Sequence, residues 1–79
     1  MNNEDGNDLR VLVVLEADTI VVTMPDSNYS ISYWKLHDTP GLVSSEIRDD
    51  PDSPISKFKF RARAWTVANA KARELGWIV

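Results

Sequence analysis

The sequence contains no cysteine, a single histidine and only three glycines among its 79 residues. Without cysteine, the chain can form neither a disulfide framework nor a thiolate metal site, and it suits a reducing compartment. The three glycines stand apart from one another, so no glycine-rich loop is present to bind phosphate. No apolar run approaches the ~20 residues that cross a membrane, and the acidic start MNNEDGND is unlike a signal peptide. We therefore expect a cytoplasmic protein without a membrane partner.

Side chains that could perform catalysis or hold a metal are also scarce. The pair His37-Asp38 matches a metal-binding dipeptide of phosphohydrolases, but such sites need further histidines and carboxylates. The acidic segment 49–52 lacks the spacing and the closing glutamate of an EF-hand. The pair Ser44-Ser45 has no general base near it in the sequence. The chain is thus expected to be no enzyme and to bind neither a cofactor nor a metal.

Charge is distributed unevenly along a chain whose net charge is −3. Residues 1–53 hold three basic and eleven acidic residues, whereas residues 54–79 hold six basic residues and one acidic residue. Such asymmetry occurs in nucleic-acid-binding proteins, but it also arises when two halves of one fold attract each other. The overall acidity favours the second explanation.

The first half of the chain predicts three β-strands. The segments 9–16, 19–24 and 29–36 (LRVLVVLE, TIVVTM and YSISYWKL) are rich in β-branched and aromatic residues and alternate with a period of two. Their connections are short, and MPDSN at 24–28 has strong turn chemistry, so the three should form an antiparallel meander. Residues 37–53 contain Pro40, Gly41 and Pro51 and are expected to form a long loop, in which GLVSSEI could make a short helical turn.

The stretch KFKFRARAW, residues 57–65, fits either a basic nucleic-acid-binding strand or a helix. Its flanks favour the helix, because Ser53-Pro54 resembles an N-cap with proline at the first helical position, and an alanine-rich segment leads to a natural stop at Gly76. At about 100° per residue, the predicted buried stripe centres on five apolar residues, with Trp65 as the anchor on the sheet. These five are Phe58, Trp65, Ala68, Ala72 and Leu75. Ala64, Ala68 and Ala72 would let the helix lie close to the sheet.

The expected fold class is therefore α+β: a two-layer βββα domain in which one C-terminal helix covers one face of a three-stranded antiparallel meander. Residues 9–79 would form this single domain, preceded by a disordered acidic tail over residues 1–8. The covered face would carry Val11, Val13, Ile20, Val22, Ile31 and Tyr33. The other face would carry Leu12, Val14, Val21 and Trp34, and either the 37–53 loop or a second subunit must cover it.

Two stretches, TMPDSNYSISYWK and RARAWTVANAKARELGWIV, resemble one group of short bacterial proteins. Neither stretch contains catalytic chemistry, and the group has no known activity. The resemblance therefore implies a bacterial source and assigns no activity, cofactor or site to any residue.

Two hypotheses of function follow from these patterns. The leading one is a non-enzymatic protein-interaction module that forms a homodimer through Leu12, Val14, Val21 and Trp34. The alternative is a nucleic-acid-binding domain that uses the outward basic residues of the helix, namely Lys59, Arg63 and Arg73. An acidic sheet would repel phosphate, which argues against DNA binding by the sheet itself. Binding by the helix ranks second because its basic residues are better explained as a solvated face that neutralises an acidic partner surface.

Overall fold

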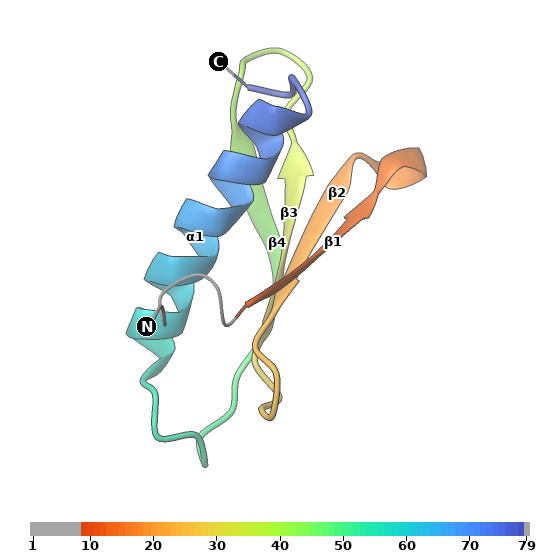
Figure 1. Cartoon of the computed structure of the whole chain (residues 1–79). Coiled ribbons are helices and arrows are strands. Elements are labelled where there is room, and N and C mark those ends of the chain that lie inside the picture. Colours follow the sequence, from red (N-terminus) through yellow and green to blue (C-terminus); the bar gives the residue numbers. More distant parts are fainter. Residues whose placement is uncertain (1–8, 79) are drawn as a thin grey trace.

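The computed structural model describes residues 9–78 and shows one antiparallel sheet with a helix across one face (Figure 1). In chain order the elements are β1 (Arg10–Val14), the 3-10 turn η2 (Leu15–Ala17), β2 (Thr19–Thr23), β3 (Ser30–Lys35), β4 (Leu42–Arg48) and α1 (Lys57–Glu74). The strands lie in the order β1-β2-β3-β4, each beside its neighbour in sequence. The α+β class and the antiparallel meander with one C-terminal helix are confirmed. The tail expected over residues 1–8 lies outside the described residues.

The sheet has four strands rather than the expected three. Residues 42–48 were predicted as part of a loop with a helical turn, but they form β4, which pairs with β3 through Trp34 and Val43 and through Tyr33 and Ser44. Six of the seven β4 residues are exposed, because α1 packs mainly on β2 and β3 and leaves β4, at the edge of the sheet, largely uncovered. An exposed edge strand needs no apolar alternation, so its sequence carried little strand signal. Pro40 and Pro51 flank β4 without interrupting it.

The core lies between α1 and the face of the sheet that the alternation predicted. Ile20, Val22, Ile31 and Tyr33 are at most 2% exposed. From the helix, they meet a row of residues spaced four apart, which are all fully buried: Phe60, Ala64, Ala68 and Ala72. The small alanine side chains let the helix backbone approach the sheet, as expected, and the contacts fall mainly on β2 and then on β3. Phe60 also stacks on Tyr29, with ring centroids 4.7 Å apart.

The orientation of α1 differs from the predicted one. Phe58 is 77% exposed and Trp65 46% exposed, whereas Phe60, which was not among the five residues of the predicted stripe, is in the core. The apolar stripe was centred on the largest side chains, but a helix that packs this closely turns its smallest side chains to the sheet. Trp65 is therefore at the side of the helix and not its anchor.

The helix ends are set by local hydrogen bonds. The N-cap is Ser56, whose hydroxyl accepts a hydrogen bond from the Lys59 amide at 3.2 Å, and not the predicted Ser53. The Ser53 hydroxyl instead accepts from the Ile55 amide within the preceding turn. At the other end, Gly76 takes a left-handed conformation with φ of 78°, and the Trp77 amide donates to the Ala72 carbonyl at 2.8 Å. Gly76 is thus the predicted stop. No helix among residues 9–78 is long and apolar enough to cross a membrane.

The burial of α1 predicts a clear order of mutational effects. Phe60→Ala should cost about 3–5 kcal/mol, because it empties a buried site in the centre of the core, and this is close to the whole stability of a small domain. Phe58→Ala should change the free energy of unfolding by no more than about 0.5 kcal/mol, since that ring is largely exposed. Urea unfolding followed by circular dichroism measures both. Equal losses for the two variants would contradict the described orientation of α1.

Candidate functional site

The face of the sheet opposite α1 carries the residues that the sequence singled out for self-association. Leu12 pairs with Val21 across β1 and β2, while Trp34 pairs with Thr19 on one side and with Val43 on the other. Alternate residues of a strand point to opposite faces, and the neighbours of these residues face the helix. Leu12, Val14, Val21 and Trp34 therefore lie on one face, as predicted, and β4 adds Val43. We call these five residues the open face.

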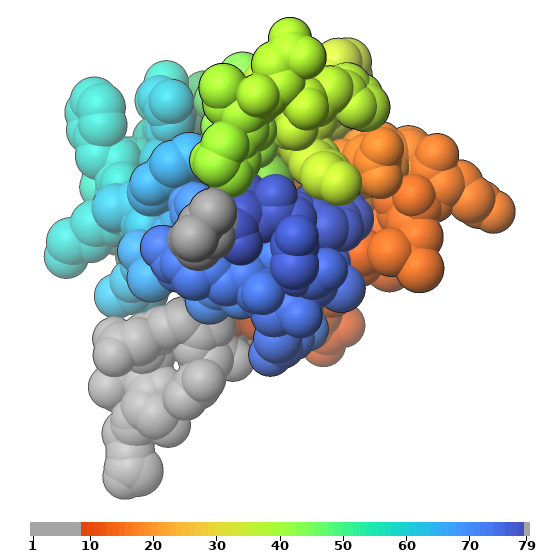
Figure 2. Space-filling model, turned by 90° about the horizontal axis from the view of Figure 1, so that it is seen from above, coloured from red at the N-terminus to blue at the C-terminus, as the bar shows by residue number. Residues whose placement is uncertain are grey.

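Three side chains of the open face are exposed to solvent, and the other two, Val14 and Val21, are half-buried. Leu12 is 62% exposed, Trp34 55% and Val43 43%. The segment 37–53 does not cover them, because β4 extends the sheet in its own plane (Figure 1). The connection between β3 and β4 lies instead beside the C-terminal end of α1, where Figure 2 shows it next to the blue end of the helix. The sequence left two possible covers for this face, the segment 37–53 or a second subunit. The exposure of these side chains shows that the segment 37–53 does not cover them.

Charges border the apolar part of the open face. Arg10, Thr23, Ser30 and Arg48 form one cross-strand row at the end of the sheet away from Trp34. The only acidic residue within the four strands is Glu46, since the other carboxylates of the described chain lie in connections or in α1. The strands are therefore not acidic, which removes the electrostatic argument against nucleic-acid contact by the sheet.

The basic residues of α1 form few ion pairs. Among residues 9–78, the ion pairs are Lys57 with Asp49 at 3.4 Å and Lys71 with Glu74 at 2.7 Å. Only the first joins the acidic half of the chain to the basic half, so direct pairing neutralises little of the charge asymmetry. The three residues predicted for nucleic-acid contact, Lys59, Arg63 and Arg73, are outside these pairs, and Lys59 and Arg73 are exposed. Lys59 and Arg63 are one helical turn apart, but Arg73 is about 15 Å further along the axis.

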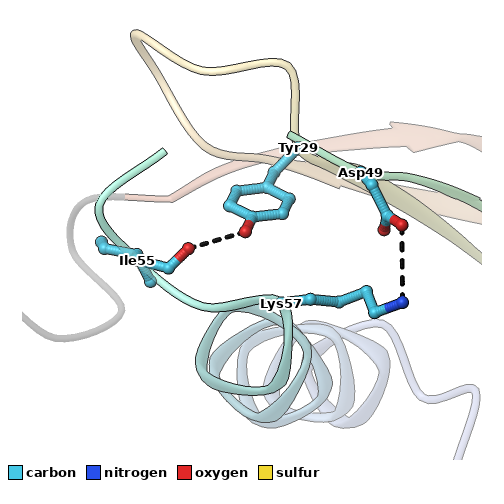
Figure 3. A network of polar contacts seen from close by, with 4 residues as sticks. All are labelled: Tyr29, Asp49, Ile55 and Lys57. Carbon is cyan, nitrogen blue, oxygen red and sulfur yellow. Dashed lines mark hydrogen bonds and ion pairs between the residues drawn. The ribbon is translucent and has the colours of Figure 1, made fainter. Parts of the chain in front are cut away.

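The acidic segment before α1 has a structural role. The buried Asp50 accepts hydrogen bonds from the Asn28 amide at 2.9 Å and from the Asp52 amide at 3.2 Å, so it joins the β2–β3 turn to the segment that enters the helix. The Tyr29 hydroxyl donates to the Ile55 carbonyl at 2.6 Å in the same region (Figure 3). Burial, and then the charges of Asp50 and Asp49, raise the pKa of Tyr29.

The structure places the residues that the sequence considered for metal binding and catalysis as follows. Within residues 9–78 no three side chains of the metal-binding types His, Cys, Asp and Glu come together. His37 is exposed in the β3–β4 connection, and Ser44 and Ser45 are exposed residues of β4.

A groove that the sequence did not predict runs between α1 and β4. Its floor is formed by Ile31, Tyr33 and Ser44 and its wall by Phe58, Arg61 and Trp65, around a volume of about 340 Å³. We call these six residues the α1–β4 groove. Its prediction would have required both β4 and the observed orientation of α1.

The Tyr33 hydroxyl is the unusual polar group of this groove. It is buried and has no hydrogen-bond partner among the described residues. Burial raises the pKa of Tyr33 to about 12, and the nearby charge of Arg61 offsets part of this rise. The Trp65 ring lies against Tyr33, with ring centroids 5.7 Å apart. An unpaired hydroxyl beside a cation suits a ligand that accepts hydrogen bonds and carries negative charge.

No protein-family model, curated protein or solved structure matches this chain. A function must therefore be proposed from the chemistry of two surfaces, the open face and the α1–β4 groove.

The two tyrosines form a matched pair for a stability test. Tyr29→Phe removes the hydrogen bond to the Ile55 carbonyl and should cost about 1 kcal/mol. Tyr33→Phe removes a buried hydroxyl that has no partner, so the free energy of unfolding should stay unchanged or rise by about 1 kcal/mol. Urea unfolding at neutral pH gives both values. A loss for Tyr33→Phe as large as that for Tyr29→Phe would mean that the Tyr33 hydroxyl is hydrogen-bonded in solution.

Proposed function

We propose that this protein is a small, non-enzymatic interaction module that forms a homodimer through its open face. The observation that carries the proposal is the exposure of Leu12, Trp34 and Val43 on the same face of the sheet, the face opposite α1. Trp34 and Val43 are cross-strand neighbours there, and Leu12 pairs with Val21. Monomeric proteins seldom expose contiguous apolar patches of this kind, and tryptophan is among the commonest interface anchors.

A second copy of the chain is the partner that the geometry supports best. A two-fold dimer places the same patch on both sides of the contact, so one sequence supplies both halves. Sheet faces pack against each other at about 10 Å and interlock their side chains. A two-fold axis through the apolar part of the open face would also place the rows with Arg10 and Arg48 at opposite ends of the interface, where the like charges stay apart.

The dimer predicts different behaviour for two half-exposed tryptophans on opposite faces. Trp34→Glu should give a folded monomer, because it places two carboxylates in the interface, whereas Trp65→Glu should leave the dimer intact. Sedimentation velocity over a range of concentrations gives the mass, and circular dichroism confirms folding.

Two results would reject the dimer through the open face. One is a wild-type protein that stays monomeric at high micromolar concentration. The other is a dimer that Trp65→Glu dissociates and Trp34→Glu does not, since the contact would then lie on the helix side of the sheet.

Nucleic-acid binding is the second candidate function. It is supported by the exposure of Lys59 and Arg73 outside any described ion pair, and by the near absence of carboxylates from the strands. Because Lys59 and Arg63 are adjacent on α1 and Arg73 is remote, contact would be confined to few phosphates. The expected affinity is therefore weak and strongly dependent on salt.

Fluorescence anisotropy with labelled single strands and duplexes of mixed sequence at low salt tests this candidate. Combined Lys59→Gln and Arg63→Gln should lower the affinity about tenfold or more, while Lys71→Gln, whose ammonium is paired with Glu74, should change it little. No binding by the wild-type protein at low salt would reject nucleic acid as the partner.

A further inference from the structure

We propose that the α1–β4 groove binds an extended peptide segment of a partner protein, which adds to the edge of β4 and directs one apolar and one acidic side chain toward the groove. The groove lies on the helix side of the sheet, so the proposal does not depend on dimerisation through the open face. Three observations support it: an edge strand beside the groove, exposed apolar side chains along its wall, and a cation next to an unpaired hydroxyl.

The first observation is the edge of the sheet. β4 pairs with β3 and has no strand on its other side among the described residues. An edge strand offers unpaired backbone donors and acceptors to an extended peptide, which adds to the sheet as a further strand. Five consecutive β4 residues, 43–47, are exposed. The edge is thus accessible over the length that a short peptide needs.

The second observation gives the spacing of the side chains. Tyr33 pairs with Ser44, and Ile31 pairs with Ile47, so Ser44 and Ile47 lie on the helix side of β4. The register shifts between these two pairs, so that Ser44 and Ile47 are three residues apart on β4 while their partners on β3 are two apart, and a peptide on the other edge of β4 would follow the spacing of β3. A peptide strand beside β4 would place one side chain next to Ile47, which is 42% exposed, and near Phe58, which is 77% exposed. A second side chain, two residues away in the peptide, would come next to Ser44.

The third observation gives the chemistry of this second side chain. Around Ser44 the groove offers the Ser44 hydroxyl, the Tyr33 hydroxyl and the Arg61 guanidinium, and Arg61 is the only charged residue among those that line it. All three groups can donate hydrogen bonds, and the one charge is positive, so a carboxylate complements them. The Tyr33 hydroxyl lies below the surface, and a small movement of the Arg61 or Trp65 side chain would open the way to it.

The test uses two peptides that differ in one group. The first is acetyl-Ser-Leu-Thr-Glu-Ser-Thr-amide, which has an apolar and an acidic residue on one side of an extended strand, and the second has Gln in place of Glu. Titrated into the isotope-labelled wild-type chain, the Glu peptide should shift the amide signals of residues 43–47 and the side-chain signal of Arg61. The Gln peptide should bind about tenfold more weakly, since it lacks the charge-assisted hydrogen bond.

Variants of the chain test the same contacts from the protein side. Arg61→Gln should reduce binding of the Glu peptide about tenfold and should remove the preference for Glu over Gln. Arg73→Gln is the matched control, because it removes the same charge from α1 away from the groove, and it should change the affinity less than twofold. Tyr33→Phe should weaken binding several-fold while the chain stays folded.

Four outcomes of the titrations would overturn the proposal, and a fifth concerns the oligomeric state. These are equal affinity for the Glu and Gln peptides, no shifts at millimolar peptide, shifts at the open face in place of β4, and shifts by glutarate alone as strong as those by the Glu peptide. The last would indicate a site for small carboxylates without strand addition. A wild-type dimer that Arg61→Gln dissociates would show that a second copy, and not a partner peptide, occupies the groove.

Discussion

The close packing of α1 on β2 and β3 is the constraint on which the other features of this protein depend. Phe60 and the alanines at positions 64, 68 and 72 are completely buried, and they bring the helix near the backbone of the two central strands. A single helix that lies this close covers the middle of one face only. The α1–β4 groove beside it and the open face behind it are both consequences of this placement, because residues 9–78 contain no second helix or sheet that covers them.

Periodicity in the sequence was sufficient to predict most of the fold. Most of its elements have one buried face and one exposed face, and such elements show a regular pattern of apolar residues. The alternation in β1, β2 and β3 assigned each side chain to the correct face, and the turn at 24–28 set the antiparallel connection. The same alternation placed Leu12, Val14, Val21 and Trp34 together, so the open face was predictable from local pattern. A partner for this face was not predictable from the sequence, because the exposure of apolar side chains does not identify a partner.

The sequence did not reveal two kinds of feature: an element with few buried residues, and an orientation that depends on the distance between α1 and the sheet. β4 has one buried residue, so its sequence lacks the alternation that marks a strand with a covered face. The orientation of α1 depends on how near the helix lies to the sheet, which a helical projection does not contain; Phe58 and Trp65 were therefore assigned to the core. The α1–β4 groove combines both errors, since β4 provides Ser44 on its floor and the rotated helix provides its wall.

Two consecutive residues of β3 connect the two surfaces. Tyr33 faces the helix side and lies in the groove floor, while Trp34 faces the other way and belongs to the open face. The geometry of a strand requires this arrangement, because the side chains of consecutive residues point to opposite faces of the sheet. β3 therefore contributes to both faces: Tyr33 fills the core beside Ile31, whereas the Trp34 side chain is more than half exposed and contributes nothing to the core that α1 completes. A substitution at position 33 thus acts on the core, and one at position 34 acts on the face that α1 leaves uncovered.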